Sequence, residues 1–415
     1  HACERFARAF SDTIGTWCDA HGIALTGHMM REPSLTSQTS AVGEVMRSLR
    51  AFALPGIDML ADRREYTTAK QAASVAHQYG REGVMSELYG VTDWDFDFRG
   101  HKLQGDWQAA LGVTVRVPHL SWVSMEGEAK RDYPASINYQ SPWYPKYRYV
   151  EDHFARVNTA MTRGTPAIRV GVIHPVESCW IHWGPAEQTA LAREELDTNF
   201  ENVTEWLLFG SVDFDYISES LLPSLCECGG APLEVGNMKY DVIIVPGCET
   251  VRASTCERLD AFRRAGGKLI FMGDAPKYLD ARPSDIPAKL WAEAEHISFT
   301  RGALLGALEG YRNVDIRQAN GELTGSLVHQ LRRDGDGLWL FVAQGKLPYN
   351  KDISRKQKIK ITVKGIYRAT LYDTLGGKIK PCRFSHSGDT TVIPAELWLH
   401  DSLLIRLDPC DTEET

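Results

Sequence analysis

The residues best suited to chemistry lie between Arg81 and Trp107, and Glu87 stands out among them. Gly83–Ser86 is a short apolar run of small and β-prone residues, and Gly90 follows soon after Glu87. This pattern predicts a buried parallel strand that ends at Glu87. Because parallel α/β folds place their sites at the carboxyl ends of such strands, we identify Glu87 as the candidate catalytic carboxylate.

The segment after Glu87 is rich in aromatic and charged residues. A wall of this composition can stack on a sugar ring and hydrogen-bond its hydroxyls, and Tyr89 and Trp94 are the candidates for that contact. In the alternative interpretation, Glu87 is a structural carboxylate that forms an ion pair with Arg99 or Lys102.

Three more predicted strands lead to polar or aromatic residues. They are residues 22–27, 55–60 and 112–118. The residues that they deliver are the histidines His28 and His119, the carboxylates Glu32 and Asp58, and the aromatic Trp122. Each histidine could bind a sugar hydroxyl or be an ordinary core histidine. Glu32 and Asp58 could supply a second carboxylate, or serve as a loop ion pair and a cap.

Helical patterns alternate with these strands, at residues 3–20, 43–53, 67–79 and 106–111. In the first helix, the three- and four-residue spacing of Phe6, Phe10, Ile14 and Trp17 predicts a buried stripe. Alternating strands and helices indicate a parallel α/β barrel or a doubly wound sheet. We count about four βα units, whereas a closed barrel needs about eight. We therefore expect residues 1–164 to be the C-terminal part of a (β/α)8 barrel whose earlier strands lie outside this chain.

The pattern of strands and helices starts again at Thr165. The pattern over residues 165–296 predicts a flavodoxin- or glutaminase-like α/β domain. Cys248 follows a strand, and His174 could serve as its base, as in an amidotransferase. Thr250 occupies the position where a nucleophile elbow needs glycine, however, so we interpret this domain as structural. Residues 297–415 show alternating patterns and Asp-Gly turns, which indicate a small antiparallel β-sandwich.

Composition narrows the function classes. The chain has 415 residues and a formal net charge of -8, and its lysines and arginines are scattered. These features argue against a nucleic-acid partner or an anionic membrane. No apolar run approaches a membrane span. The nine cysteines have irregular spacing, which is typical of reduced thiols in a cytoplasmic protein. We find no motif for a metal or cofactor.

Several stretches carry a resemblance to known enzymes. HGIALTGHMM, PGIDML, SVAHQYGREGVMSELYG, DWQAALGV and the run from Pro118 to Tyr147 resemble the barrel of bacterial α-L-rhamnosidases. The order of the three domains is similar to that of trimeric cytoplasmic β-galactosidases. The resemblance implies a glycoside hydrolase that acts on a carbohydrate, with Glu87 on the seventh barrel strand.

The same resemblance places the catalytic acid on a strand before His1. We therefore expect a homo-oligomer, or a partner chain that supplies the rest of the barrel. A β-galactosidase-like enzyme is the first alternative. A non-catalytic carbohydrate-binding or scaffold protein without the acid is the second.

Overall fold

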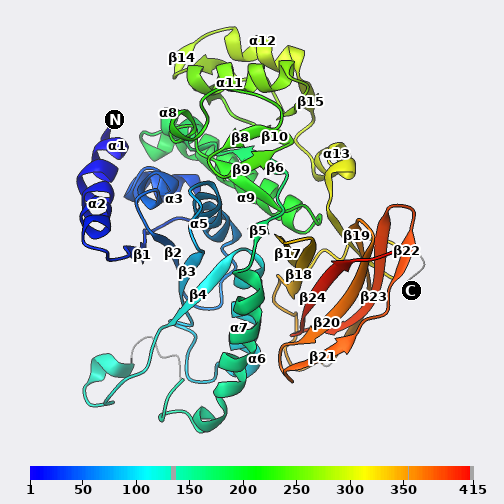
Figure 1. The fold of residues 1–415 in the computed structure, drawn as a ribbon. Helices are drawn as coiled ribbons and strands as arrows, with labels where there is room; N and C mark the ends of the chain where they lie inside the picture. Colours follow the sequence, from blue (N-terminus) through cyan, green and yellow to red (C-terminus); the bar gives the residue numbers. More distant parts are fainter. Residues whose placement is uncertain (132–136, 354, 412–415) are drawn as a thin grey trace.

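The structure is a computed structural model that describes residues 1–131, 137–353 and 355–411 (Figure 1). Residues 132–136, within the last stretch quoted for the family resemblance, lie outside the described residues. Two regions of parallel sheet and helices are followed by an antiparallel region, so the chain is a mixed α/β protein. No helix in the described part of the chain is both long and apolar enough to cross a membrane.

The first sheet has four parallel strands in sequential order. They are β1 (Thr26–His28), β2 (Leu54–Met59), β3 (Val84–Leu88) and β4 (Val113–Pro118). Helices α5 (Tyr66–Gln78), α6 (Phe98–Ala110) and α7 (Arg148–Met161) pack on this sheet. The β2 and β3 side chains Ile57, Met59, Val84 and Leu88 are buried.

The opposite face of the first sheet is partly open. Along β4, Val115 and Val117 are 40% and 47% exposed. His28 at the end of β1 is also exposed. Because successive strand residues point to opposite faces, Asp58 and Glu87 lie on the face opposite to Met59 and Leu88.

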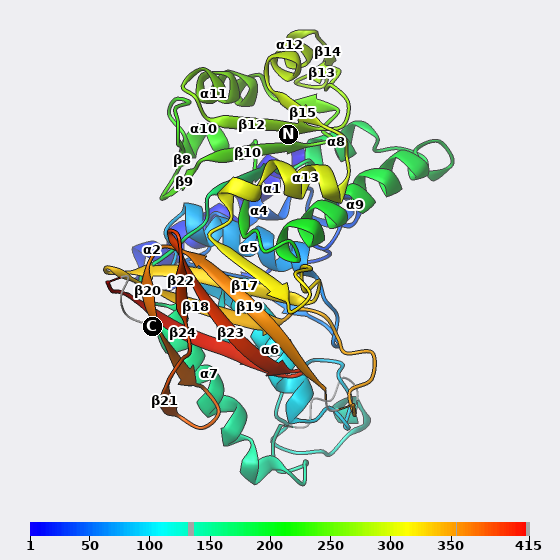
Figure 2. The same cartoon turned by 90° about the vertical axis from the view of Figure 1, so that its right-hand side faces the viewer.

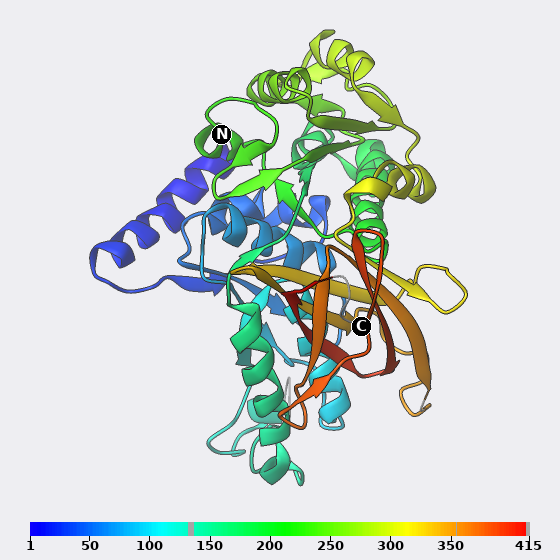
Figure 3. The same cartoon turned by 45° about the vertical axis from the view of Figure 1, so that its right-hand side comes forward.

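The predicted burial of the first helix is wrong. The segment is helical, as α1 (Ala2–Ala7), a π-helical turn (Arg8–Asp12) and α2 (Thr13–Ala20). The predicted stripe of large side chains is exposed: Phe6 42%, Phe10 47%, Ile14 37% and Trp17 56%. The small-residue face is the buried one. At Gly15 a Cβ atom would lie 2.6 Å from the carbonyl oxygen of Ala51, so only a helix face made of small residues can approach Ala51 this closely. Figure 3 shows this helix at the outer edge of the molecule.

Two helical boundaries also differ from the prediction. The polar loop predicted after His28 contains α3 (Leu35–Ala41), which begins with a capping box of Ser34 and Ser37. Helix α6 begins at Phe98 rather than Asp106, because the Asp97 side chain accepts hydrogen bonds from the amides of Arg99 and Gly100. As a result, the aromatic loop after Glu87 is shorter than predicted.

The second sheet has five parallel strands in the order β15-β12-β10-β6-β7. Their bounds are β6 (Val170–Ile173), β7 (Phe214–Ile217), β10 (Val242–Pro246), β12 (Lys268–Met272) and β15 (Glu295–Ile297). Read from β7, the order is 2-1-3-4-5, which is the flavodoxin-like arrangement with its switch point between β6 and β10. Helices α8 (Val176–Ile181), α9 (Ala186–Leu208), α11 (Ala253–Arg264) and α12 (Ile286–Glu293) accompany it. One hydrophobic core runs continuously from α5 of the first region into this region.

The last region contains two antiparallel sheets around a core of their own (Figure 2). One sheet consists of β16 (Val314–Gln318), β19 (Lys356–Lys364), β23 (Thr390–Trp398) and β22 (Ser385–Ser387). The other consists of β21 (Lys378–Pro381), β20 (Tyr367–Asp373), β24 (Ser402–Pro409), β18 (Gly337–Gln344), β17 (Leu327–Asp334) and β5 (Thr165–Pro166). Thr165 and Pro166, predicted to begin the second region, therefore pair with the last one.

Candidate active site

Glu87 lies at the carboxyl end of β3, one residue before the strand ends. Its partner in the parallel register on β2 is Asp58. Adjacent strands are about 4.8 Å apart, so the two carboxylate side chains leave the sheet side by side on its partly open face. The Glu87 side chain is 32% exposed, which leaves it accessible from solvent.

Two histidines face the two oxygens of Glu87. His28 Nε2 lies 3.4 Å from Oε2, and His119 Nε2 lies 4.0 Å from Oε1. His28 Nδ1 is 2.6 Å from the carbonyl oxygen of Met29, which can only accept, so Nδ1 carries a proton. Nε2 therefore attracts the carboxylate when His28 is the imidazolium ion. The structure brings together Glu87, His28, Asp58 and His119, all of which the sequence pointed to.

The alternative ion pairs predicted for Glu87 are absent from the described residues. Arg99 binds Asp97 and Asp352 instead, at 2.6 and 3.1 Å. Lys102 lies on helix α6 and binds Asp106 at 2.5 Å. Glu87 is thus not held by either cation.

Two other carboxyls, Asp58 and Glu32, lie at this edge. Burial is the main cause that raises the pKa of Asp58, and the neighbouring Glu87 raises it further. Burial raises the pKa of Glu32 to about 7. Glu32 is 6% exposed, and its Oε1 has no hydrogen-bond partner among the described residues. Gln71 fixes this loop by donating to the main-chain oxygen of Glu32.

Tyr89 does not line the site, contrary to the prediction. It has a left-handed backbone with φ of 75°, and its side chain is fully buried. Its hydroxyl donates to the main-chain oxygen of His101 and accepts from Arg116. Trp94 is 38% exposed in the loop after Glu87. Trp122 is half-buried in the loop after β4. Both tryptophans follow the strands that deliver Glu87 and His119.

A buried polar network that joins α6, α7 and the last region was missed by the sequence reading. Asp106, the first residue of the helix predicted at 106–111, lies inside α6 and accepts from Lys102. Its other oxygen is 2.6 Å from His153 Nε2, and His153 Nδ1 is 2.9 Å from the Thr374 hydroxyl. The pKa of Asp106 falls to about 2 because Lys102 and then His153 outweigh the effect of burial. The spacing of Lys102 and Asp106, four residues apart, was the available signal for an ion pair within a helix.

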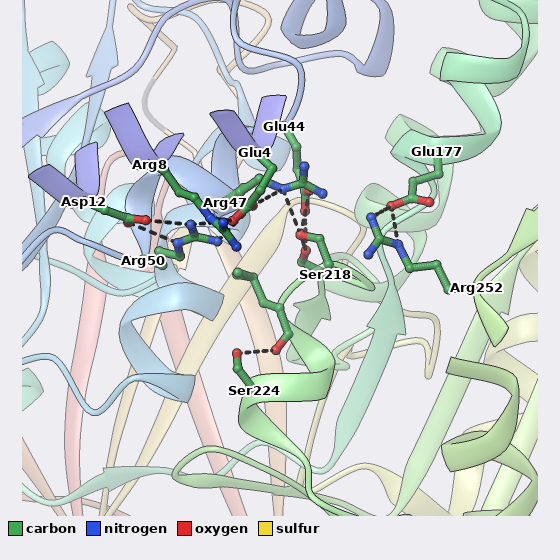
Figure 4. A network of polar contacts seen from close by, with 12 residues as sticks. Glu4, Arg8, Asp12, Glu44, Arg47, Arg50, Glu177, Ser218, Ser224 and Arg252 are labelled. Carbon is green, nitrogen blue, oxygen red and sulfur yellow. Dashed lines mark hydrogen bonds and ion pairs between the residues drawn. The ribbon is translucent and has the colours of Figure 1, made fainter. Parts of the chain in front are cut away.

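Contacts with the first region lie along one side of the switch-point crevice of the second sheet (Figure 4). Arg47 binds Glu44 at 3.1 Å and Ser220 at 3.1 Å, and Ser218 also donates to Glu44. Trp180 donates to the main-chain oxygen of Gly43. A cavity of about 650 Å³, lined by Glu177 and Arg252 among others, remains at the carboxyl ends of β6 and β10.

Cys248 at this crevice is unsuited to nucleophilic catalysis. It is 3% exposed, and burial followed by the negative charges of Glu219 and Glu177 raises the pKa of its thiol well above the usual range. A reactive cysteine needs the opposite environment. His174 is fully buried as well, and burial lowers its pKa to about 4.

Comparisons with known proteins reveal the architecture to which this site belongs. No protein-family model matches the chain, and no curated protein does. The rhamnosidase from Novosphingobium sp. PP1Y aligns with 98% of this chain and 39% of its own, at 18% identity and a TM-score of 0.75. The apo exo-carrageenase GH42 from Bacteroides ovatus aligns with 99% of this chain and 55% of its own, at 12% identity and a TM-score of 0.60. The β-galactosidase from Bacillus circulans sp. alkalophilus aligns with 97% and 82%, at 10% identity and 0.53.

The fold is therefore one that occurs in carbohydrate-cleaving enzymes. The expected resemblance to both a rhamnosidase and β-galactosidases is confirmed at the level of the fold. The chain spans less than half the length of the rhamnosidase and little more than half that of the carrageenase.

Proposed function

We propose that the chain is part of a glycoside hydrolase in which Glu87 is the nucleophile or the base. The observation that carries the proposal is the position of Glu87. It stands in register with Asp58 at the carboxyl end of a parallel sheet, with His28 and His119 beside it. Glycoside hydrolysis needs such a carboxylate together with a second, proton-holding carboxyl group.

In this mechanism, Glu87 acts on the anomeric carbon of the bound sugar. Its distance from the acid determines the chemistry: about 5 to 5.5 Å favours direct attack with retention, and about 6.5 to 9.5 Å leaves room for a water and inversion. His28 and His119 lie beside the two oxygens of Glu87 and orient the carboxylate. Trp94 and Trp122 are the aromatic groups available to pack on the sugar ring.

The first sheet is best explained as part of a barrel. A doubly wound sheet reverses its strand order, as the second region does, whereas β1 to β4 run in sequence. In the described residues β1 pairs only with β2, and the sheet face with Val115 and Val117 is partly open. We propose that further strands, from this protein or a partner chain, pair with β1, close that face and bring the acid. They would also cover the exposed side chains of Phe10 and Trp17.

An α-L-rhamnosidase-like activity on a terminal sugar of plant or host glycosides is our first choice of substrate. The TM-score of 0.75 to a rhamnosidase, against 0.60 to the β-galactosidase Gan42B, supports that choice. A β-galactosidase-like activity is the alternative. Homo-oligomer formation through the second region, where Trp183 is 50% exposed, belongs to the same proposal.

Glu87→Gln tests the proposal, because it keeps the size of the side chain and removes its charge. The assay is hydrolysis of the 4-nitrophenyl glycosides of α-L-rhamnose and β-D-galactose by the natural full-length protein. We expect kcat/KM to fall by about a thousandfold or more, at unchanged melting temperature. Exposed Glu187→Gln, on α9, is the matched control.

Two results would argue against this role. If Glu87→Gln kept more than about a tenth of the rate, a loss under roughly 1.4 kcal/mol, Glu87 would not be the reacting group. If the wild-type protein bound these sugars without cleaving either glycoside, the non-catalytic scaffold would be the better description.

A further inference from the structure

A large groove lies apart from Glu87, between helix α7 and the six-stranded sheet of the sandwich. Its volume is about 770 Å³. Helix α7 runs antiparallel to β4: Glu151 in its first turn binds Arg116, and Asn158 binds the carbonyl of Thr114. The groove is lined by the second half of α7, so it lies toward the amino end of β4 and away from the carboxyl end where Glu87 sits. Figure 2 shows α7 beside β20 and β21.

The groove carries more positive than negative side chains, although the chain as a whole has a net charge of -8. Four cations and three carboxylates line it: Arg156, Arg163, Lys378, Arg406, Asp334, Asp373 and Asp408. All three carboxylates are already paired. Asp334 and Asp408 bind arginines of the groove, and Asp373 binds Lys380.

Two of the cations remain available to a ligand. Lys378 is exposed and has no ion-pair partner within the residues that the structure describes. Arg156 is 38% exposed; its Nη1 donates to the main-chain oxygens of Thr374 and Leu375, and its Nη2 forms only a long ion pair of 3.9 Å with Asp152. Its guanidinium packs on Gly377, where a Cβ atom would lie 3.1 Å from Nη2. Arg156 is therefore held next to Lys378 at one end of the groove.

The floor of the groove is apolar and aromatic. Trp339 and Tyr372 pack edge to face with ring centroids 4.9 Å apart. Trp339 is buried under Arg406, so half-buried Tyr372 and exposed Ile379 provide the accessible apolar surface. The C–H face of a pyranose packs on such a floor, while charged planar groups at the rim bind hydroxyls and carboxylates. Volumes of about 300 to 1,000 Å³ are typical of pockets for small molecules.

We propose that this groove is a second saccharide-binding site, selective for a sugar with an anionic group that binds Lys378 and Arg156. The proposal rests on the proposed function, since a carbohydrate-cleaving enzyme meets such chains as substrate or as the surrounding polymer. The groove binds without cleaving, because its carboxylates are all engaged in ion pairs. A uronate carboxylate and a sulfate ester both carry the negative charge that this site requires.

Binding to this 415-residue chain can be measured by isothermal titration calorimetry at low salt. The probes are trigalacturonate, its fully methyl-esterified form, and galactose 6-sulfate. We expect trigalacturonate to bind more tightly than the uncharged ester, and the affinity to fall as salt is raised. Galactose 6-sulfate shows whether sulfate replaces carboxylate.

Lys378→Glu should weaken trigalacturonate binding by about fivefold or more, because it replaces an attraction with a repulsion. The matched control is Lys360→Glu, an exposed lysine on β19 of the other sheet, which should leave the affinity unchanged. Glu87→Gln should also leave it unchanged, so a failure of the hydrolase proposal can be told apart from a failure of this one. Equal binding of the acid and its ester, an unaffected Lys378→Glu variant, or a Kd above about 10 mM for every probe would each overturn the proposal.

Discussion

Glu219 should make the stability of this protein decrease as pH rises. The residue follows β7 at the crevice between the first and second regions, and it is 3% exposed. Burial, with a further contribution from the negative Glu177, raises its pKa to about 8. Its carboxyl accepts a hydrogen bond of 2.7 Å from the backbone amide of Arg252. At neutral pH, Glu219 is therefore protonated in the folded protein and ionised in the unfolded chain.

The sign and the size follow from this difference. Between pH 4.5, the ordinary value, and about 8, the folded state binds more protons than the unfolded state, so the free energy of unfolding falls with rising pH. Each pH unit lowers the free energy of unfolding by about 1.4 kcal/mol, which sums to about 5 kcal/mol across the range. This sum is an upper value, because local relaxation reduces the cost of burying a charged group. Above about pH 8 the dependence levels off.

Glu219→Gln isolates this effect, because glutamine keeps an oxygen acceptor for Arg252 and cannot ionise. We expect the variant to gain stability over the wild type progressively from about pH 5 to about pH 8. Urea unfolding at several pH values measures the difference, and exposed Glu187→Gln is the control. Parallel pH dependences for Glu219→Gln and wild type would show that Glu219 is ionised in the folded state, and would refute the reasoning.

Two more predictions concern buried groups. Asp106→Asn leaves Lys102 without its partner, so we expect a loss of about 3 to 5 kcal/mol in urea unfolding near neutral pH. In wild type the contribution of Asp106 should be lost as pH falls from 3.8 through about 2, the range over which the folded protein must take up this proton. Cys248 should resist iodoacetamide in the native state and react after unfolding, as peptide mass spectrometry of the labelled protein can show; rapid native labelling would contradict the burial of its thiol. Cys248→Ser should leave glycoside hydrolysis unchanged, and a large loss would give the second region a part in the chemistry.

The sequence predicted correctly those elements whose residue pattern fits only one kind of secondary structure. Helix α9 spans Ala186–Leu208, and from Leu196 onward its buried residues recur at helical spacing. The β3 strand was placed correctly because a short buried run carries a single polar residue at its end. Glu87 and Asp58 could be paired in advance, since neighbouring parallel strands end at the same edge.

Side-chain direction could not be read from spacing alone. The stripe of Phe6, Phe10, Ile14 and Trp17 has the period of a buried helix face, yet the close approach of Gly15 to Ala51 turns the opposite face inward. A periodic apolar stripe indicates a contact surface, but it does not identify the part of this protein or of a partner that covers it. Tyr89 fails for a local reason, because a left-handed backbone at this residue directs its ring into the core.

The carboxyls at the edge of the first sheet differ in a way that a hydrolase requires. Glu87 lies between two imidazoles and keeps a third of its side chain in solvent, which suits a group that must be anionic when it reacts. Burial raises the pKa of Asp58, and it raises the pKa of Glu32 to about 7. Glycosidases separate the charged role from the proton-holding role by environments that give the two carboxyl groups different pKa values. If no further strand supplies an acid, Asp58 is the carboxyl of this chain best placed to take the acid's role, since it is the register neighbour of Glu87.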